Sequence, residues 1–269
     1  MLPKASTDPS RWIAFALCAL SSFAVSVVAE PSPRVVHVFV ALADNQHQGI
    51  IPVPPALGNG RDPQRNLYWG AAYGVKTYFK ASQDWELVWS GRGAKDAILE
   101  RCVFKSRTND VYLVADAYEG SQIKQAVTDF LSAAAGVAKE KVSFKMRSVE
   151  VSMAIAGDAD LVVYLGHDAF MDFQIPPIAA AKGDKRRQTI ILACVSKAYF
   201  APYIRQTGAE PLLWTTGLMA PEAYTLKAAL DGWIAHEDDE AIRRRAAQAY
   251  DRYQKCGARA ALKLFATNW

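Results

Sequence analysis

Two residues of this sequence, His167 and Cys194, could together form a nucleophilic pair. Each follows a short apolar run, and 26 residues separate them. A cysteine thiolate is a strong nucleophile, and a nearby imidazole can lower the thiol pKa and protonate a leaving amine. The pair is therefore suited to acyl transfer, with the backbone at Gly166 and the amide of Cys194 as candidates to stabilise an oxyanion.

The same residues also have a structural interpretation. Cysteine is often a small buried hydrophobe, and a single histidine at the end of a strand is often only a satisfied polar group. Ser196, two residues after Cys194, is expected to cap or line the turn rather than to react. The choice depends on whether the surrounding elements bring the imidazole and the thiol together.

Apolar, β-branched runs predict five short strands, most of them buried on both faces. They cover residues 35–42, 111–115, 161–165, 189–193 and 211–216. Helical periodicity predicts helices over residues 67–80 and 120–135, a helix that begins near Pro221, and one or two helices over residues 238–265. Gly136 is placed to end the second of these helices.

Strands that alternate with helices predict a single α/β domain, residues 30–269, with a mostly parallel sheet and helices on both faces. Functional groups in such a sheet gather at the carboxyl ends of the strands. His167 and Cys194 follow two successive strands, so they meet at one edge if these strands are neighbours.

These strand ends resemble the caspase-like cysteine peptidases, the clan of gingipains, legumains and metacaspases. In that clan one hydrophobic strand ends in the catalytic His and the next ends in the catalytic Cys, as residues 161–167 and 189–194 do here. Residues 211–224 are also similar to the strand and helix that follow the Cys in bacterial members. The resemblance implies a caspase-like three-layer sandwich and a peptidase with His167 and Cys194 as its catalytic pair. Asp168 stands where the clan usually has Gly, and the His-to-Cys spacing is short.

Three acidic residues, Asp44, Asp116 and Asp168, follow predicted strands at the same edge. An acidic pocket there would favour Lys or Arg in a peptide substrate. The competing interpretation is that each Asp caps a loop or a helix.

Composition excludes several classes of protein. The chain has 269 residues, is 51% hydrophobic and 22% charged, and carries a net charge of +4, which is ordinary for a globular protein. The near balance of charge gives no case for a nucleic-acid partner. Four cysteines without a C-x-x-C pair give no structural zinc motif, and no metal or organic cofactor is implied.

The N-terminal residues 1–29 predict a secretory signal peptide, because Lys4 and Arg11 precede an uncharged stretch that ends in Ala29. The stretch over residues 12–29 is also close to the minimum length of a membrane anchor. Both interpretations predict export, to the periplasm or the extracellular space, with membrane attachment through residues 12–29 as the alternative.

The sequence therefore predicts an exported cysteine hydrolase that acts on peptides or proteins. Two alternatives stay open: a noncatalytic caspase-like binding or scaffolding module of the cell envelope, and a hydrolase of small esters or amides. The cysteine count after residue 29 is odd, so at least one thiol cannot pair within the chain. We expect that thiol to be Cys194, with Cys102 and Cys256 either paired or buried.

Overall fold

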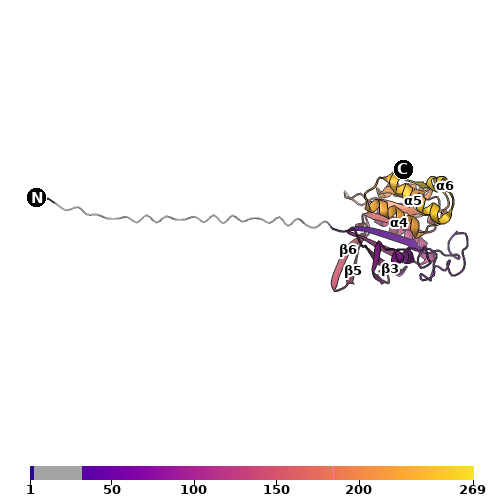
Figure 1. Ribbon diagram of the computed structural model, residues 1–269, viewed down its shortest axis with the longest axis horizontal. Helices are drawn as coiled ribbons and strands as arrows, with labels where there is room; N and C mark the ends of the chain where they lie inside the picture. Colours follow the sequence, from indigo (N-terminus) through magenta and orange to yellow (C-terminus); the bar gives the residue numbers. More distant parts are fainter. Residues whose placement is uncertain (3–31, 184) are drawn as a thin grey trace. The chain divides into compact units, whose positions relative to one another are not determined.

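The computed structural model describes residues 1–2, 32–183 and 185–269 (Figure 1). The predicted signal or anchor segment over residues 12–29 lies outside the described residues. In the part of the chain that is described, none of the helices has the length and apolar character needed to cross a membrane.

Residues 33–269 form a single α/β unit around an eight-stranded sheet with the order β10-β9-β8-β7-β1-β4-β3-β2. The five adjacent strands from β9 to β4 are parallel to one another, whereas β3 and the two edge strands, β2 and β10, run antiparallel to their neighbours. The parallel strands are β1 (Arg34–Ala41), β4 (Val111–Tyr118), β7 (Leu161–Leu165), β8 (Gln188–Leu192) and β9 (Glu210–Thr215). The antiparallel strands are β2 (Trp85–Gly91), β3 (Ile98–Ser106) and β10 (Phe265–Ala266).

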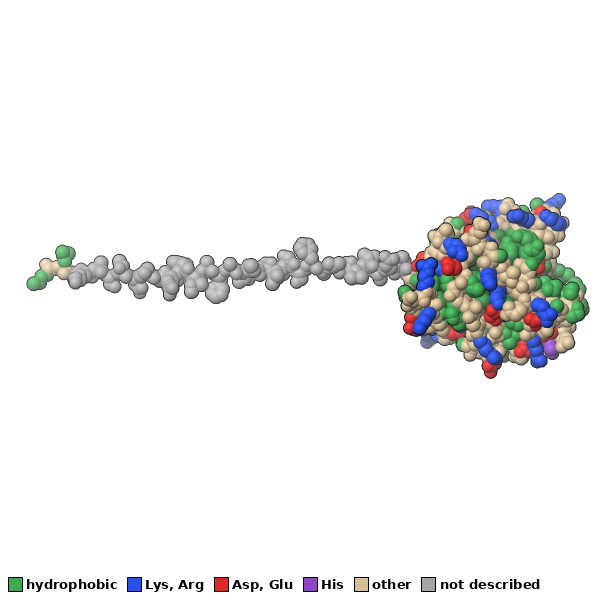
Figure 2. Space-filling model, turned by 60° about the horizontal axis from the view of Figure 1, so that its bottom comes forward, with side chains coloured by type: hydrophobic (Ala, Val, Ile, Leu, Met, Phe, Trp, Pro, Cys, Tyr) green, Lys and Arg blue, Asp and Glu red, His purple; other side chains and the backbone are tan. Residues whose placement is uncertain are grey.

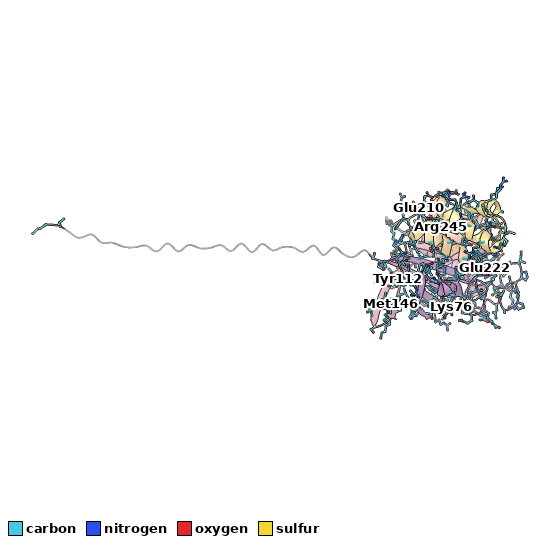
Figure 3. The ribbon with its side chains drawn as sticks, in the orientation of Figure 1. Lys76, Tyr112, Met146, Glu210, Glu222 and Arg245 are labelled. Carbon is cyan, nitrogen blue, oxygen red and sulfur yellow. The ribbon has the colours of Figure 1, made fainter. Side chains whose placement is uncertain are left out.

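Helices cover both faces of the sheet. One face carries α1 (Val75–Ala81), α4 (Ala223–Ile234), α5 (Asp239–Gln254) and α6 (Ala258–Leu264), and the last three lie together in Figure 1. The other face carries α2 (Ile123–Ala134), α3 (Ser196–Thr207) and a separate hairpin of β5 (Lys139–Met146) and β6 (Val149–Ala156). Met146, near the tip of this hairpin, is labelled in Figure 3. The predicted fold class is confirmed.

Strand β1 shows how the sequence produces the layers. Val36, Val38 and Val40 are buried among the α1, α4 and α5 side chains, whereas the alternate residues Val35 and Phe39 are buried on the α2 side. Successive side chains of a strand point to opposite faces, so a continuous apolar run has two faces to bury. Each such side chain contributes about 1.5 to 3 kcal/mol when it is removed from water.

All five predicted strands are present, with bounds that differ by a few residues. The antiparallel strands β2, β3 and β10 and the β5–β6 hairpin were not predicted. The predicted helix over residues 67–80 is wrong in its first half, because only Val75–Ala81 is helical. Turns occupy the preceding residues, where a Cβ on Gly70 or Gly74 would lie within about 2.5 Å of backbone atoms of the same segment. Gly136, with φ of 74°, ends the α2 region as predicted.

Candidate active site

His167 and Cys194 come from neighbouring parallel strands, as the hypothesis requires. Leu165, the last residue of β7, pairs with Leu192, the last residue of β8. The Gly166 N–H continues this ladder by donating to the Leu192 carbonyl at 3.2 Å. His167 and Cys194 each lie two residues beyond this pair, at the carboxyl ends of strands about 4.8 Å apart.

The backbone on both sides of this pair is constrained. Gly166 has φ of 152°, and a Cβ at this position would lie 2.8 Å from the Ala41 carbonyl oxygen of β1. Glycine is therefore required before His167. Val195, directly after Cys194, has φ of 50°, which is unfavourable for a β-branched residue. Its N–H donates to the Gly217 carbonyl at 2.8 Å, which holds the turn that leads into α3. Strain of this kind is frequent at functional sites.

Cys194 is partly buried, and its thiol contacts the backbone of Met219. The Met219 N–H donates to Sγ at 3.4 Å, and Sγ lies 3.6 Å from the Met219 carbonyl oxygen. Burial raises the pKa of the Cys194 thiol, the Met219 contact opposes this, and the charge of Asp168 raises the pKa further. The resting cysteine is therefore a thiol rather than a thiolate at neutral pH.

The His167 side chain is only 6% exposed and is held by an acidic residue. Its Nε2 lies 2.8 Å from Oδ2 of Asp172, and its carbonyl accepts a hydrogen bond from the Tyr164 hydroxyl at 2.9 Å. Within the described residues, no hydrogen bond joins His167 to Cys194. The pair thus lies in register, but its two side chains are bonded to other groups.

The two oxyanion candidates differ in availability. The Gly166 N–H donates to the Leu192 carbonyl within the sheet, so in this structure it is not free to donate to an oxyanion. The Cys194 N–H donates to no other described residue. It remains a candidate, because a donor without a partner at a strand-to-helix turn is the arrangement that an oxyanion site needs.

Asp168 is fully buried beside the pair. Its Oδ1 accepts the Phe170 N–H at 3.0 Å and so caps the 3₁₀ turn Ala169–Met171, whereas Oδ2 has no hydrogen-bond partner among the described residues. Burial, together with the charge of Asp172, raises the pKa of Asp168 to about 7, against the smaller opposing effect of the Phe170 bond. A buried carboxyl that is neutral below pH 7 does not provide the acidic pocket that was expected from it.

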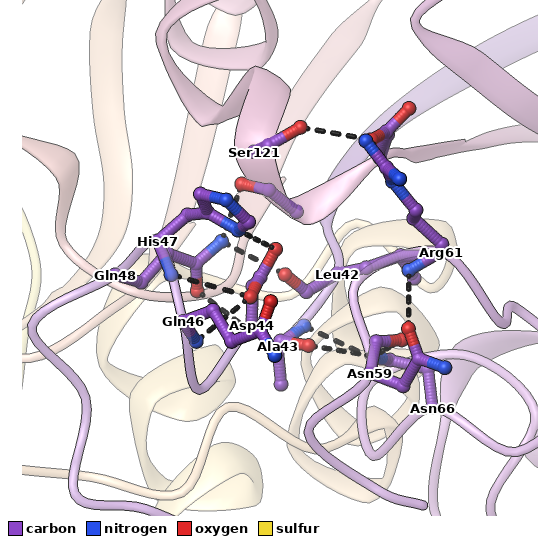
Figure 4. Close-up of polar contacts among 12 residues, drawn as sticks. Leu42, Ala43, Asp44, Gln46, His47, Gln48, Asn59, Arg61, Asn66 and Ser121 are labelled. Carbon is purple, nitrogen blue, oxygen red and sulfur yellow. Dashed lines mark hydrogen bonds and ion pairs between the residues drawn. The ribbon is translucent and has the colours of Figure 1, made fainter.

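Asp44 lines a pocket of about 470 Å³ at the end of β1, but its carboxylate is already occupied (Figure 4). Oδ1 accepts the backbone N–H groups of Gln46 and His47, and Oδ2 lies 2.9 Å from Nδ1 of His47. The loop-capping interpretation accounts for these contacts. The pocket is therefore lined by an Asp–His pair rather than by a free carboxylate.

Asp116 lies within the sheet and is fully buried. Arg101 donates to both of its oxygens at 2.6 and 2.7 Å, and His37 Nε2 lies 3.0 Å from Oδ2. Although burial opposes ionisation, the hydrogen bonds from Arg101 and His37 hold the pKa of Asp116 below its ordinary value. The expected substrate contact of Asp116 is not supported, since these internal partners occupy it. His37 is a buried residue of strand β1.

The remaining expectations concern cysteines and Ser196. Cys102 is buried, Cys256 is exposed, and both are free. The expectation that these two either pair or are both buried is therefore wrong. The Ser196 hydroxyl donates to the Ile191 carbonyl at 2.9 Å and accepts from the Thr215 N–H at 3.0 Å, so it secures the turn after Cys194. In residues 32–183 and 185–269, no group of three or more His, Cys, Asp or Glu side chains is arranged to hold a metal ion.

Two contributors to the site were not identified from the sequence, namely Asp172 and Met219. Asp172 lies five residues after His167, beyond a short 3₁₀ turn that apolar patterning does not reveal. Met219 reaches Cys194 from the loop after β9, through backbone atoms that carry no sequence signal. The one sequence signal that could have identified this contributor is the presence of Asp172 five residues after His167.

The surface that Figure 2 displays shows Lys and Arg interspersed with Asp and Glu side chains. That face therefore has no extended patch of one sign, in keeping with the near balance of charge in the sequence. Comparisons of the chain with protein-family models, with curated proteins and with solved structures found no match.

Proposed function

We propose that this protein is a cysteine hydrolase that cleaves peptide bonds, with Cys194 as nucleophile and His167 as general acid and base. The observation that carries the proposal is the register of β7 and β8, which gives an imidazole and a thiol corresponding positions at the carboxyl edge of a parallel sheet. Acyl transfer requires a nucleophile and a base within reach of each other, and the ends of two neighbouring strands can supply them.

The proposed reaction has two steps. His167 accepts the Cys194 proton, the sulfur attacks the substrate carbonyl carbon, and the protonated imidazole returns the proton to the amine as the C–N bond breaks. Water, deprotonated by His167, then attacks the thioester, which releases the acid and restores the thiol. The Cys194 N–H is available to stabilise the negative charge on the carbonyl oxygen in both steps.

The raised pKa of Cys194 bears on the first step. Because the resting group is a thiol, proton transfer to His167 accompanies attack instead of preceding substrate binding. For this transfer the Sγ contact with Met219 must open, since Sγ now lies 3.6 Å from that carbonyl oxygen. We infer that a bound substrate replaces the Met219 contact.

The experiment is turnover of a fluorogenic peptide library by the purified full chain, compared with Cys194→Ser and His167→Ala. Cys256→Ser is the matched control, because Cys256 is exposed and lies outside the site. We expect cleavage by the wild type and the control, and none by the other two variants. Equal cleavage by all four proteins would contradict the proposal.

A second candidate function is a noncatalytic binding or scaffolding module, and one observation favours it. The Cys194 thiol forms hydrogen bonds with the Met219 backbone and, among the described residues, none with His167. If the protein captures a peptide from the library without cleaving it, and capture is unchanged in Cys194→Ala, the binding function replaces the hydrolase. Turnover of small esters with none of peptides would instead indicate a small-molecule hydrolase.

We also propose that residues 1–29 direct export, with cleavage after Ala29 and with anchoring through residues 12–29 as the alternative. The support is the sequence pattern of two cationic residues before an uncharged apolar stretch. N-terminal sequencing of the protein from a fractionated bacterial host tests this. A mature terminus at Glu30 in the soluble exported fraction supports cleavage, and an intact chain in the membrane fraction supports anchoring.

A further inference from the structure

We propose that Asp172 is a positioning residue for His167, and that the loop after β1 holds Asp172 in place. The inference rests on the proposed function, in which His167 is the acid and base. It adds which imidazole nitrogen faces the chemistry and what keeps it there.

The first step of the argument is the tautomer of His167. Its Nε2 lies 2.8 Å from Oδ2 of Asp172. A carboxylate only accepts hydrogen bonds, so Nε2 carries the proton in the neutral ring and Nδ1 carries the lone pair. No other described residue forms a hydrogen bond with Nδ1. Nδ1 is therefore the nitrogen that exchanges a proton with Cys194.

The second step is the way in which Asp172 itself is held. It follows the 3₁₀ turn Ala169–Met171, and its own N–H donates to the Ala169 carbonyl at 3.2 Å. Its Oδ2 also accepts the Gly49 N–H at 3.1 Å. A Cβ on Gly49 would lie 2.5 Å from Oδ1, so this close approach depends on glycine. The loop between β1 and Pro52 thus fixes the carboxylate that orients His167.

Because of these contacts, two variants at position 172 can separate the effect of the carboxylate charge from the effect of the His167 orientation. Gly49 N–H can only donate, so an Asn at position 172 is expected to keep its amide oxygen where Oδ2 now accepts. Asp172→Asn should therefore retain the Nε2–H bond and lose only the negative charge. Asp172→Ala should lose both.

The direct test is nuclear magnetic resonance of the imidazole nitrogens and their protons in the full chain, with His167 assigned from His167→Gln. We expect an Nε2–H signal protected from solvent exchange in the wild type, retained in Asp172→Asn and lost in Asp172→Ala. A neutral wild-type ring protonated at Nδ1, or an Nε2–H signal unchanged in Asp172→Ala, would overturn the inference.

Kinetics provide a second readout. We expect kcat to fall about 100-fold in Asp172→Ala and about 10-fold in Asp172→Asn, with KM little changed, because general acid–base catalysis contributes roughly 10²- to 10⁴-fold. Gly49→Ala should lower kcat in the same way, since its Cβ displaces the carboxylate. The matched control is Asp158→Ala. Asp158 lies before the start of β7, and its carboxylate pairs with Lys139. This variant should leave kcat unchanged.

The two readouts keep this inference distinct from the proposed function. If no peptide is cleaved but the Nε2–H signal depends on Asp172, the hydrolase proposal fails and the positioning role stands. If peptides are cleaved and Asp172→Ala turns over at the wild-type rate, the positioning role fails and the hydrolase stands.

Discussion

Two histidine–aspartate pairs of this protein, His37–Asp116 and His167–Asp172, differ in which of their hydrogen-bonding atoms have partners. In the middle of the sheet, His37 is bonded through Nε2 to Asp116 and through Nδ1 to the Ala156 N–H, so both of its nitrogens are used. At the carboxyl edge, His167 is bonded through Nε2 to Asp172 and has no partner at Nδ1 among the described residues.

The acidic residues near these pairs show the same contrast. Asp116 is fully buried with three hydrogen bonds from two side chains, which hold its pKa below the ordinary value despite burial. Asp168 is equally buried, but its Oδ2 has no hydrogen-bond partner in the described part of the chain, and burial raises its pKa to about 7. The side chains around His37 and Asp116 have their hydrogen-bonding atoms paired, and this network stabilises the fold. Around His167 and Asp168, Nδ1 and Oδ2 have no partner among the described residues and are free to take a proton. Residue type and burial alone do not distinguish these roles. The number of hydrogen-bond partners that each side chain has does distinguish them.

The largest expected effect is the separation of activity from stability in the two histidines. His167→Ala should reduce kcat/KM at least about 1,000-fold, because the proposed general acid and base is lost. His37→Ala should lower the free energy of unfolding by roughly 1 to 3 kcal/mol, because buried partners lose their hydrogen bonds, and should retain turnover. Peptide hydrolysis and urea denaturation measure the two quantities. A large stability loss in His167→Ala without loss of turnover would remove the distinction.

The next effect concerns the ion pair inside the sheet. Asp116→Asn leaves the buried Arg101 guanidinium with Glu140 as its remaining carboxylate partner, so we expect the free energy of unfolding to fall by up to about 3 kcal/mol. The control Asp158→Asn disrupts an exposed pair with Lys139 and should cost under about 1 kcal/mol. Equal losses in the two variants would show that the Asp116 network is not specially stabilising.

Asp168 should give the fold a characteristic pH dependence. In the folded chain its carboxyl keeps a proton up to about pH 7, whereas in the unfolded chain it ionises near pH 4. The folded state therefore binds more protons between these values, and its stability falls as pH rises from about 4 to about 7. Asp168→Asn lacks this decline, so the variant should gain roughly 2 to 4 kcal/mol relative to wild type between pH 4 and pH 8. Denaturation curves that differ by the same amount at every pH would contradict the assignment.

The smallest effects are differences in thiol reactivity. Iodoacetamide should modify exposed Cys256 first, partly buried Cys194 more slowly, and buried Cys102 only after unfolding. Burial raises the pKa of Cys102 to about 12, which further suppresses its reaction. Peptide mapping by mass spectrometry gives the three rates. A disulfide between Cys102 and Cys256 would contradict the structure.

The central part of the fold could be predicted from the sequence because its signal is local. The run over residues 35–42 has side chains to bury on both sides, and such a run specifies a central parallel strand. Strand β2 gives a weaker signal, since its burial is mixed and its role depends on pairing with β3. The predicted helix is wrong over residues 67–74, because apolar periodicity takes no account of Gly70 and Gly74, which shape the turns there.

The candidate site was predictable only as far as its backbone. The sequence predicts that His167 and Cys194 follow two neighbouring strands, and the register of β7 and β8 aligns the carboxyl ends of these strands. The partners of each side chain come from elsewhere: Gly49 and Asp172 for the histidine, and Met219 for the cysteine. The pKa of Asp168 is raised because the carboxyl is buried and its Oδ2 has no hydrogen-bond partner among the described residues. Both features depend on the packing around Asp168 and not on its place in the sequence.

The most direct test of the central claim uses a mixture of peptidyl acyloxymethyl ketones, which alkylate a cysteine that is activated beside a bound peptide. The full chain is treated at pH 7, and the modified residue is located by mass spectrometry, with exposed Cys256 as the internal control for simple accessibility. We predict labelling at Cys194 in preference to Cys256, and its loss in His167→Ala. Labelling at Cys256 alone, or labelling of Cys194 at the same rate in His167→Ala, would contradict the catalytic pair.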